Sequence, residues 1–176
     1  MRVVEEKDDN KMQDPATMQK DIMVKVYDTQ DDAQLKMYTD QTGKFPTKAV
    51  SGNQYIMVLV EIDSGAILTE SMGNHTSSEM IKTYQALVDK LRSCGIKPKR
   101  HILDNEALIE FKKCIQENGM AYQLVPPHDH RRNVAEKAIQ TFKNHFVSIL
   151  CGVDEKFLMS LWYKLMPQAE MALNLL

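Results

Sequence analysis

Residues 35–72, LKMYTDQTGKFPTKAVSGNQYIMVLVEIDSGAILTESM, decide the fold class of this chain of 176 residues. They contain three segments whose apolar and β-branched residues are typical of strands. The middle segment, QYIMVLVEID (54–63), is an almost continuous apolar run, which indicates a central strand. Stretches rich in Gly, Pro, Ser and Asn separate the segments and favour turns. We therefore predict an antiparallel meander with strands at 35–40, 54–63 and 66–72.

After residue 72 the period of the apolar residues changes from strand to helix. The run Thr76-Ser-Ser-Glu79 predicts a capping box, and the helix behind it ends at Gly95. Further along the chain, Pro126 and Pro127 terminate a strand. The other predicted elements are a strand at 97–104, a helix at 107–118, a strand at 120–125, a helix with Glu136 in its first turn, and a helix at 154–166 that breaks near Pro167.

The predicted order within residues 34–176 is β-β-β-α-β-α-β-α, with one more helix at the C-terminus. A meander followed by αβ crossovers predicts an α/β fold, in which a mixed five-stranded sheet has helices on both faces. Right-handed crossovers allow the first and fourth strands to lie side by side and parallel. Asp40 and Asp104, which end these two strands, then meet at the edge of the sheet where α/β proteins have their active sites.

The composition narrows the class of protein. Hydrophobic residues make up 43% of the chain and charged residues 26%, which is ordinary for a soluble globular protein. No apolar run reaches the roughly 20 residues of a membrane span, and residues 1–10 lack the apolar core of a signal peptide. The three cysteines form no CxxC pair, which argues against a disulfide framework or a cysteine zinc site. We expect an intracellular protein.

Charge is distributed unevenly along the chain, although the net charge is only −2. Residues 1–33 are polar and acidic with little periodicity, and we expect them to be a flexible leader. Residues 97–145 contain nine basic and six acidic residues. This modest positive bias permits a polyanionic partner without requiring one.

Three carboxylates form the basis of the functional prediction, namely Asp40, Asp104 and Glu136. Magnesium prefers oxygen ligands, and two such ions about 4 Å apart can activate an attacking oxygen and stabilise a leaving one in phosphoryl transfer. Each acid also has a structural interpretation, because Asp is common in turns and Glu in a first helical turn complements the helix dipole. The metal site is therefore predicted only if one fold brings all three acids together.

The helix that contains Glu136 also carries candidate nucleic-acid contacts. Glu136, Gln140 and Lys143 are spaced i, i+4 and i+7, so they share one face of the helix. On this face, the acid could bind a metal ion, and the amide and the cation could contact DNA, with Lys143 reaching a phosphate. An ordinary solvated helix face is the alternative.

The loop before this helix is basic. Arg131, Arg132 and the helix N-terminus around Asn133 are candidate phosphate contacts, with ordinary surface charge as the alternative. His128 and His130 are close enough in sequence to suggest zinc, but no other Cys or His cluster has matching spacing. We interpret these two histidines as polar loop residues.

Three motifs occur in a recognisable order: YTDQTGKFPTKAVSGNQYIMVLVEIDSGAI (38–67), HILDNEA (101–107) and PPHDHRRNVAEKAIQTFKNHF (126–146). Over residues 37–176 the chain resembles the integrase catalytic core of LTR retrotransposons, most closely the copia type. The resemblance implies a ribonuclease-H-like fold and an Asp-Asp-Glu triad that binds two Mg²⁺ or Mn²⁺ ions. It also implies 3′-end processing and strand transfer of element DNA into target DNA.

Carried over residue by residue, the resemblance assigns the catalytic and metal-binding roles to Asp40, Asp104 and Glu136. It assigns contacts with DNA ends to Gln140 and Lys143. DNA is the implied partner, and we expect a homo-oligomer that acts in the nucleus, without a membrane or an organic cofactor.

The chain departs from the family pattern at several points. Residues 105–135 separate Asp104 from Glu136, a slightly shorter spacing than usual, and Glu106 adds an acid where relatives have glycine. No HHCC zinc module precedes the core, and the chain ends inside an expected helix at LNLL. We therefore expect a truncated, decayed or co-opted core whose activity in isolation is doubtful. Two alternatives stay open: an inactive remnant that binds nucleic acid or self-associates, and a metal-dependent nuclease of the same fold.

Overall fold

The computed structural model describes residues 35–104, 108–125 and 133–175; for Asp104, Val125 and residues 133–135 it describes the backbone alone. Several predicted features lie outside the described residues, namely the leader (1–33), Glu106, His128, His130, Arg131 and Arg132.

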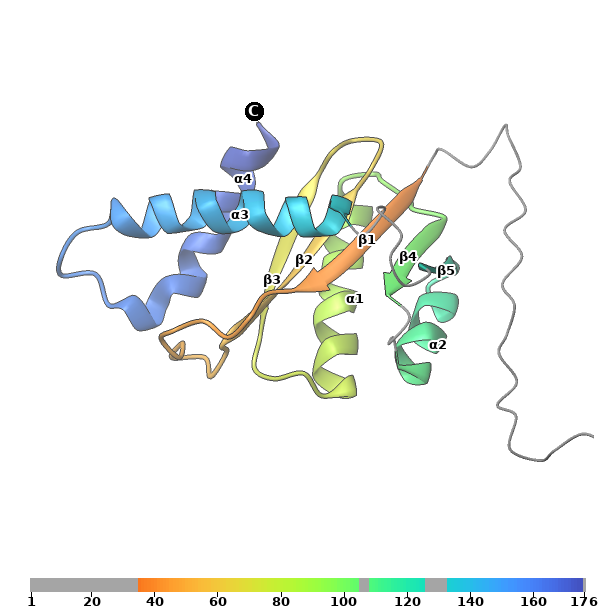
Figure 1. The fold of residues 1–176 in the computed structure, drawn as a ribbon, viewed down its shortest axis with the longest axis horizontal. Helices are drawn as coiled ribbons and strands as arrows, with labels where there is room; N and C mark the ends of the chain where they lie inside the picture. Colours follow the sequence, from red (N-terminus) through yellow and green to blue (C-terminus); the bar gives the residue numbers. More distant parts are fainter. Residues whose placement is uncertain (1–34, 105–107, 126–132, 176) are drawn as a thin grey trace, which may run out of the picture. The chain divides into compact units, whose positions relative to one another are not determined.

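Strands and helices follow the predicted order along the chain (Figure 1). Their bounds are β1 Lys36–Gln41, β2 Tyr55–Glu61, β3 Ile67–Met72, α1 Ser77–Ser93, β4 Arg100–Asp104, α2 Ile109–Glu117, β5 Ala121–Val125, α3 Asn133–Cys151, the 3₁₀ helix η2 Met159–Leu165 and α4 Met166–Asn174.

The strands form one five-stranded sheet in the order β3-β2-β1-β4-β5. β1 pairs antiparallel with β2, and β2 pairs antiparallel with β3, so the predicted meander is confirmed. β1 pairs parallel with β4, and β4 pairs parallel with β5. The predicted mixed sheet, with its first and fourth strands adjacent and parallel, is therefore confirmed as well.

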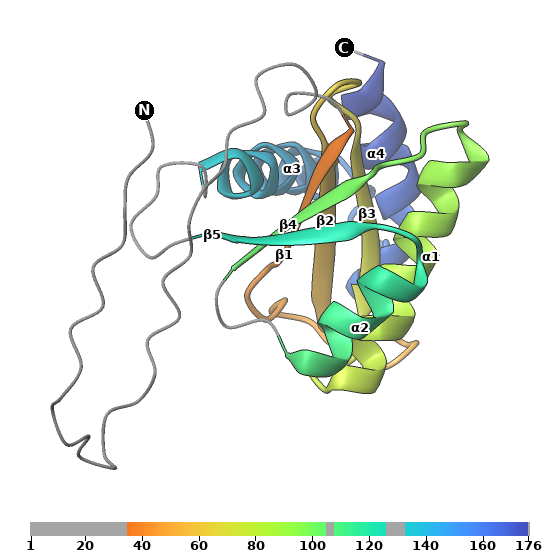
Figure 2. The same cartoon turned by 90° about the vertical axis from the view of Figure 1, so that its right-hand side faces the viewer.

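Strand β2 is buried on both faces of the sheet, which explains its continuous apolar sequence. Met57 and Leu59 belong to a core that lies under α1 and α2, and we call this side the α1/α2 face. Ile56 and Val58, which alternate with them, pack under α3 and α4 on the α3/α4 face. Figure 2 shows α1 and α2 on one side of the sheet and α3 on the other.

Helix α4 covers the free edge of strand β3. The side-chain amide of Asn174 donates to the carbonyl of Ile67 at 2.9 Å and accepts from its N–H at 2.8 Å. One turn earlier, a carboxylate oxygen of Glu170 accepts from the N–H of Thr69 at 2.8 Å. These two side chains take the place of a neighbouring strand, so the edge does not present these backbone groups to another sheet.

Two local predictions are wrong. The capping box does not form, because the hydroxyl of Thr76 donates to the side chain of Asn74 at 2.6 Å and the carboxylate of Glu79 accepts from the N–H of Gly73 at 3.3 Å. The last helix does not break at Pro167. Proline lacks an N–H and its φ angle suits the first helical turn, so Pro167 lies at the beginning of α4, which continues directly from η2.

Within the described ranges, we find no helix long and apolar enough to span a membrane.

Candidate functional site

The predicted site lies where strands β1 and β4 end. Their parallel pairing matches Lys36 with Arg100 and continues to Tyr38 with Ile102. Asp40 and Asp104 each lie two residues beyond that last matched level, so both acids stand at the same end of neighbouring strands. Neighbouring strands run about 4.8 Å apart. The structure therefore brings together the two strand ends that the sequence singled out.

Asp40 is half-buried and is matched with Val58 of β2. Its Oδ1 accepts a hydrogen bond from the backbone N–H of Gln41 at 2.8 Å. This bond holds one carboxylate oxygen next to the backbone of its own strand. Asp104 is the last residue of β4, and in the β4–β5 ladder it is matched with Val125. The side chain of Asp104 lies outside the description.

Helix α3 packs against the same two strands, two residues before their predicted acids. Its residue Ala138 is buried in a small cluster with Tyr38 of β1, Val60 of β2 and Ile102 of β4. Positions two residues apart on a strand share a face of the sheet. Because Tyr38 and Ile102 each lie two residues before a predicted acid, the positions of both acids belong to the face that α3 covers.

Glu136 lies in the first turn of α3, two residues before the buried Ala138, and its side chain is exposed. Gln140 and Lys143 are also exposed, as a shared solvent-facing side of the helix requires. The amide of Gln140 donates to Asn144 at 2.9 Å along the helix. The backbone of Asn133 begins α3.

Among the side chains that the structure describes, no group of three or more His, Cys, Asp or Glu residues is arranged to hold a metal ion. Asp104, another member of the predicted set, is not among these side chains. The donor chemistry nevertheless fits Mg²⁺ or Mn²⁺, because all three predicted ligands are carboxylates and these ions prefer oxygen.

Directly beneath the site, on the α1/α2 face, a buried histidine joins the two strands that end in acids. His101 of β4 is fully buried, and its Nε2 lies 2.9 Å from the hydroxyl oxygen of Thr39, the residue before Asp40. The ring stacks against Tyr84 at a centroid distance of 5.3 Å. Burial lowers the pKa of His101 to about 3, so the imidazole is neutral near pH 7.

Sequence reasoning assigned His101 no role. The signal that identifies it is strand alternation, because His101 and Leu103 lie on one face of β4 while Ile102 lies on the other. His101 is matched with Met37 in the β1–β4 ladder, and its side chain bonds Thr39, two residues further along β1 on the same face. The bond therefore connects β4 to the residue that precedes Asp40.

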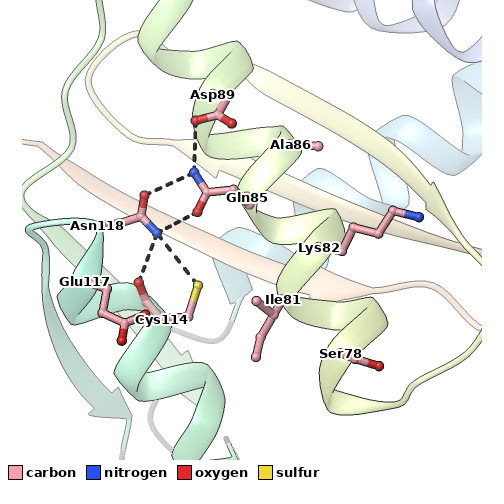
Figure 3. A pocket seen from close by; sticks show the side chains of 9 residues that line it. All are labelled: Ser78, Ile81, Lys82, Gln85, Ala86, Asp89, Cys114, Glu117 and Asn118. Atoms are coloured by element: carbon pink, nitrogen blue, oxygen red, sulfur yellow. Dashed lines mark hydrogen bonds between the residues drawn. The ribbon is translucent and has the colours of Figure 1, made fainter.

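A cavity of about 670 Å³ opens between α1 and α2 (Figure 3). Asn118, at the end of α2, is held there by the side-chain amide of Gln85 in two hydrogen bonds, and Arg92 of α1 donates to its side chain and to its carbonyl. Because α1 and α2 cover the face of the sheet opposite α3, this cavity is separate from the predicted carboxylate site.

No protein-family model matches the sequence, and no curated protein matches it either. By structure, the chain is similar to the catalytic core domain of BIV integrase, with a TM-score of 0.61 and 14% identity over 80% of this chain and 84% of that one. It is also similar to a chain of the simian T-cell lymphotropic virus intasome in complex with PP2A regulatory subunit B56 gamma. That match has a TM-score of 0.60 and 17% identity, and it covers 79% of this chain and 46% of the other.

These similarities establish the fold. The mixed five-stranded sheet with flanking helices is the ribonuclease-H-like fold of integrase catalytic cores. The fold class expected from the sequence is therefore confirmed.

Proposed function

We propose that this chain is the catalytic core of a polynucleotidyl transferase that integrates the DNA of an LTR retrotransposon of the copia type. The observation that carries the proposal is the meeting of the ends of β1 and β4 beneath α3. Each of these three elements contributes one predicted acid, namely Asp40, Asp104 or Glu136. The integrase-like fold supports the same activity.

Asp40, Asp104 and Glu136 would hold two Mg²⁺ or Mn²⁺ ions in this proposal. When bound, such ions lower the pKa of an attacking hydroxyl or water and stabilise the charge on the leaving oxygen. The protein's part is to hold the carboxylates in place. The hydrogen bond from Gln41 positions the carboxylate of Asp40, and the contact between Thr39 and His101 connects the strands below it.

The remaining predicted residues would bind the DNA backbone. Lys143 on the exposed side of α3 would contact phosphates, and Arg131 and Arg132, which precede that helix in the sequence, would add further cations. Gln140 can offer its second amide hydrogen and its carbonyl oxygen to DNA while it keeps its bond to Asn144. One structural neighbour is part of an intasome, which supports DNA as a partner and a homo-oligomeric assembly. We propose that this assembly acts in the nucleus, because integration requires chromosomal DNA.

The test is Mn²⁺-dependent strand transfer on a short DNA duplex, with wild type and Asp104→Asn compared in parallel. Loss of one metal ligand removes several kcal/mol of transition-state stabilisation, so we expect transfer to fall roughly a hundredfold to a thousandfold. The matched control is Asp89→Asn on α1, an exposed aspartate that accepts a hydrogen bond from Gln85 on the opposite face of the sheet. That control is expected to retain full transfer.

Other outcomes separate the alternatives. Equal transfer by wild type and Asp104→Asn, or no transfer by either, contradicts the proposed activity. Metal-dependent nicking without transfer, abolished in Asp104→Asn, indicates a nuclease of the same fold. DNA binding or self-association without any metal-dependent chemistry indicates a remnant that has lost catalysis.

A further inference from the structure

The loop that connects β1 to β2 (residues 42–54, TGKFPTKAVSGNQ) follows the predicted site directly, because it begins two residues after Asp40. It contains two lysines, Lys44 and Lys48, and no acidic residue. Both lysine side chains are exposed. Within the described residues neither of them forms an ion pair. Within the described part of the chain, no acidic side chain neutralises their positive charge.

This β1–β2 loop is anchored to the body of the protein, although long connecting loops are commonly mobile. Phe45 stacks on Trp162 of η2 at a centroid distance of 4.4 Å and lies 6.2 Å from Phe146 of α3. The indole N–H of Trp162 donates to the carbonyl of Thr47 at 2.9 Å.

Backbone hydrogen bonds hold the remainder of the loop. The N–H of Val50 donates to the carbonyl of Ser160 at 2.9 Å, and the N–H of Thr42 donates to that of Ile56 at 2.8 Å. The two lysines are therefore presented from a fixed platform, which reduces the entropy lost when they bind a ligand.

The position of the β1–β2 loop, next to Asp40 and α3, indicates which ligand its lysines would bind. Four residues of extended chain span at most about 14 Å, so Lys44 lies within that distance of Asp40. Phe45 also packs against the buried Phe146, which lies about one helical turn after the exposed Lys143 on α3. The loop therefore connects the strand end that carries Asp40 to the part of α3 that carries Lys143.

Isolated surface lysines are usually just solvated, so the charges on the neighbouring elements matter. Within α3 the only acid is Glu136, a predicted metal ligand, while Lys137 and Lys143 are both exposed. The loop has no acid at all. The loop and α3 together therefore carry four lysines and one acid, in a chain whose net charge is −2.

We propose that the β1–β2 loop is a second binding surface for the DNA backbone, on which Lys44 and Lys48 contact phosphates beside the predicted catalytic carboxylates. The inference rests on the proposed function for the identity of its ligand. A phosphate contact carries no sequence information, so this surface positions DNA of any sequence.

The test measures binding of a fluorescently labelled DNA duplex by anisotropy, from about 50 to 200 mM salt, without divalent metal. The Lys44→Gln/Lys48→Gln double variant removes two phosphate contacts from the full chain. Each contact contributes about one to the slope of log K against log salt, so we expect the slope to become less steep by about two. Binding should weaken equally for unrelated DNA sequences.

The matched control is Lys82→Gln/Lys113→Gln on α1 and α2, where both lysines are similarly exposed but lie on the opposite face of the sheet. An unchanged slope in the control and a reduced slope in the loop variant support the inference. Equal slopes in wild type and the loop variant overturn it, and so does an equal reduction in the control. No binding by wild-type chain overturns it together with the proposed DNA partner.

Comparison of this titration with the strand-transfer assay separates this inference from the proposed chemistry. If wild type shows no strand transfer but the loop variant still loses slope, the DNA-binding surface stands and the catalytic proposal fails. Thermal melting of each variant verifies that the chain remains folded, because substitutions of exposed lysines should leave the melting temperature almost unchanged.

Discussion

Strand β2 contributes to both faces of the sheet, and the two cores that it enters differ in composition. On the α1/α2 face, Met57 and Leu59 lie in a core that contains the buried polar rings of Tyr84 and His101. On the α3/α4 face, Ile56 and Val58 pack under an aromatic group made of Phe142, Phe146 and Trp162, with Phe45 against it.

The two faces of the sheet differ in their connection to the predicted site. On the α1/α2 face, the bond between Thr39 and His101 joins strands β1 and β4, and helices α1 and α2 pack against the sheet. The α3/α4 face connects its core directly to functional candidates, because α3 carries Glu136 and Phe45 belongs to the loop that follows Asp40. Substitutions in the two cores should therefore have different consequences beyond the loss of stability.

The largest effect that separates the two faces is expected for Trp162→Ala. Trp162 is fully buried, and replacing a buried tryptophan by alanine typically costs about 3–5 kcal/mol in the free energy of unfolding. The substitution also removes the ring that holds Phe45 and the donor to Thr47. Urea unfolding measures the first effect, and the rate of tryptic cleavage after Lys44 and Lys48 measures the second.

Leu87→Ala in the other core is the matched control for this variant. Leu87 is also fully buried, and the expected loss is about 2–5 kcal/mol. At conditions where both variants are equally folded, only Trp162→Ala should expose the β1–β2 loop to trypsin. Equal cleavage in the two variants would mean that the aromatic group does not anchor the loop.

A second effect belongs to the α1/α2 face and depends on pH. Burial lowers the pKa of His101 to about 3, against an ordinary value of 6.5, so the unfolded chain binds a proton below pH 6.5 that the folded chain does not. Stability is therefore complete above pH 6.5 and falls as the pH decreases toward 3. Linkage gives a loss of about 2 kcal/mol by pH 5 from this group.

The direct measurement is the NMR chemical shift of the His101 ring as a function of pH. We expect it to stay constant from pH 8 to 5. Titration of His101 near pH 6 in the folded protein would show that water reaches the ring, which would contradict its full burial in the structure.

The smallest expected effect has the opposite sign. The hydroxyl of Tyr84 is buried and has no hydrogen-bond partner within the described residues, and burial raises its pKa above the ordinary value. Removing an unsatisfied buried polar group relieves its desolvation cost, so Tyr84→Phe should stabilise the chain by about 1 kcal/mol. Denaturant unfolding measures this, and destabilisation would reveal a partner for the hydroxyl, such as an ordered water molecule.

Much of the fold could be predicted because its strongest signals are local. The continuous apolar run of β2 and the turn residues around it depend on near neighbours in the chain. The approach of Asp40 and Asp104 followed from the handedness of crossover connections, a rule that applies to many sequences. The capping box was wrong, since the side chains of Thr76 and Glu79 found partners before the helix instead.

The sequence by itself determined the order of strands and helices, the acids at the strand ends and the cations after Asp40. These features depend only on residue type and on the spacing of neighbouring residues in the chain. Only the tertiary structure decided that His101 lies inside and bonds Thr39, 62 residues away. It also decided that Trp162 anchors Thr47 across 115 residues and that Asn174 covers the edge of β3 across 107. Such contacts depend on which surfaces meet after the chain collapses, and no local pattern specifies that.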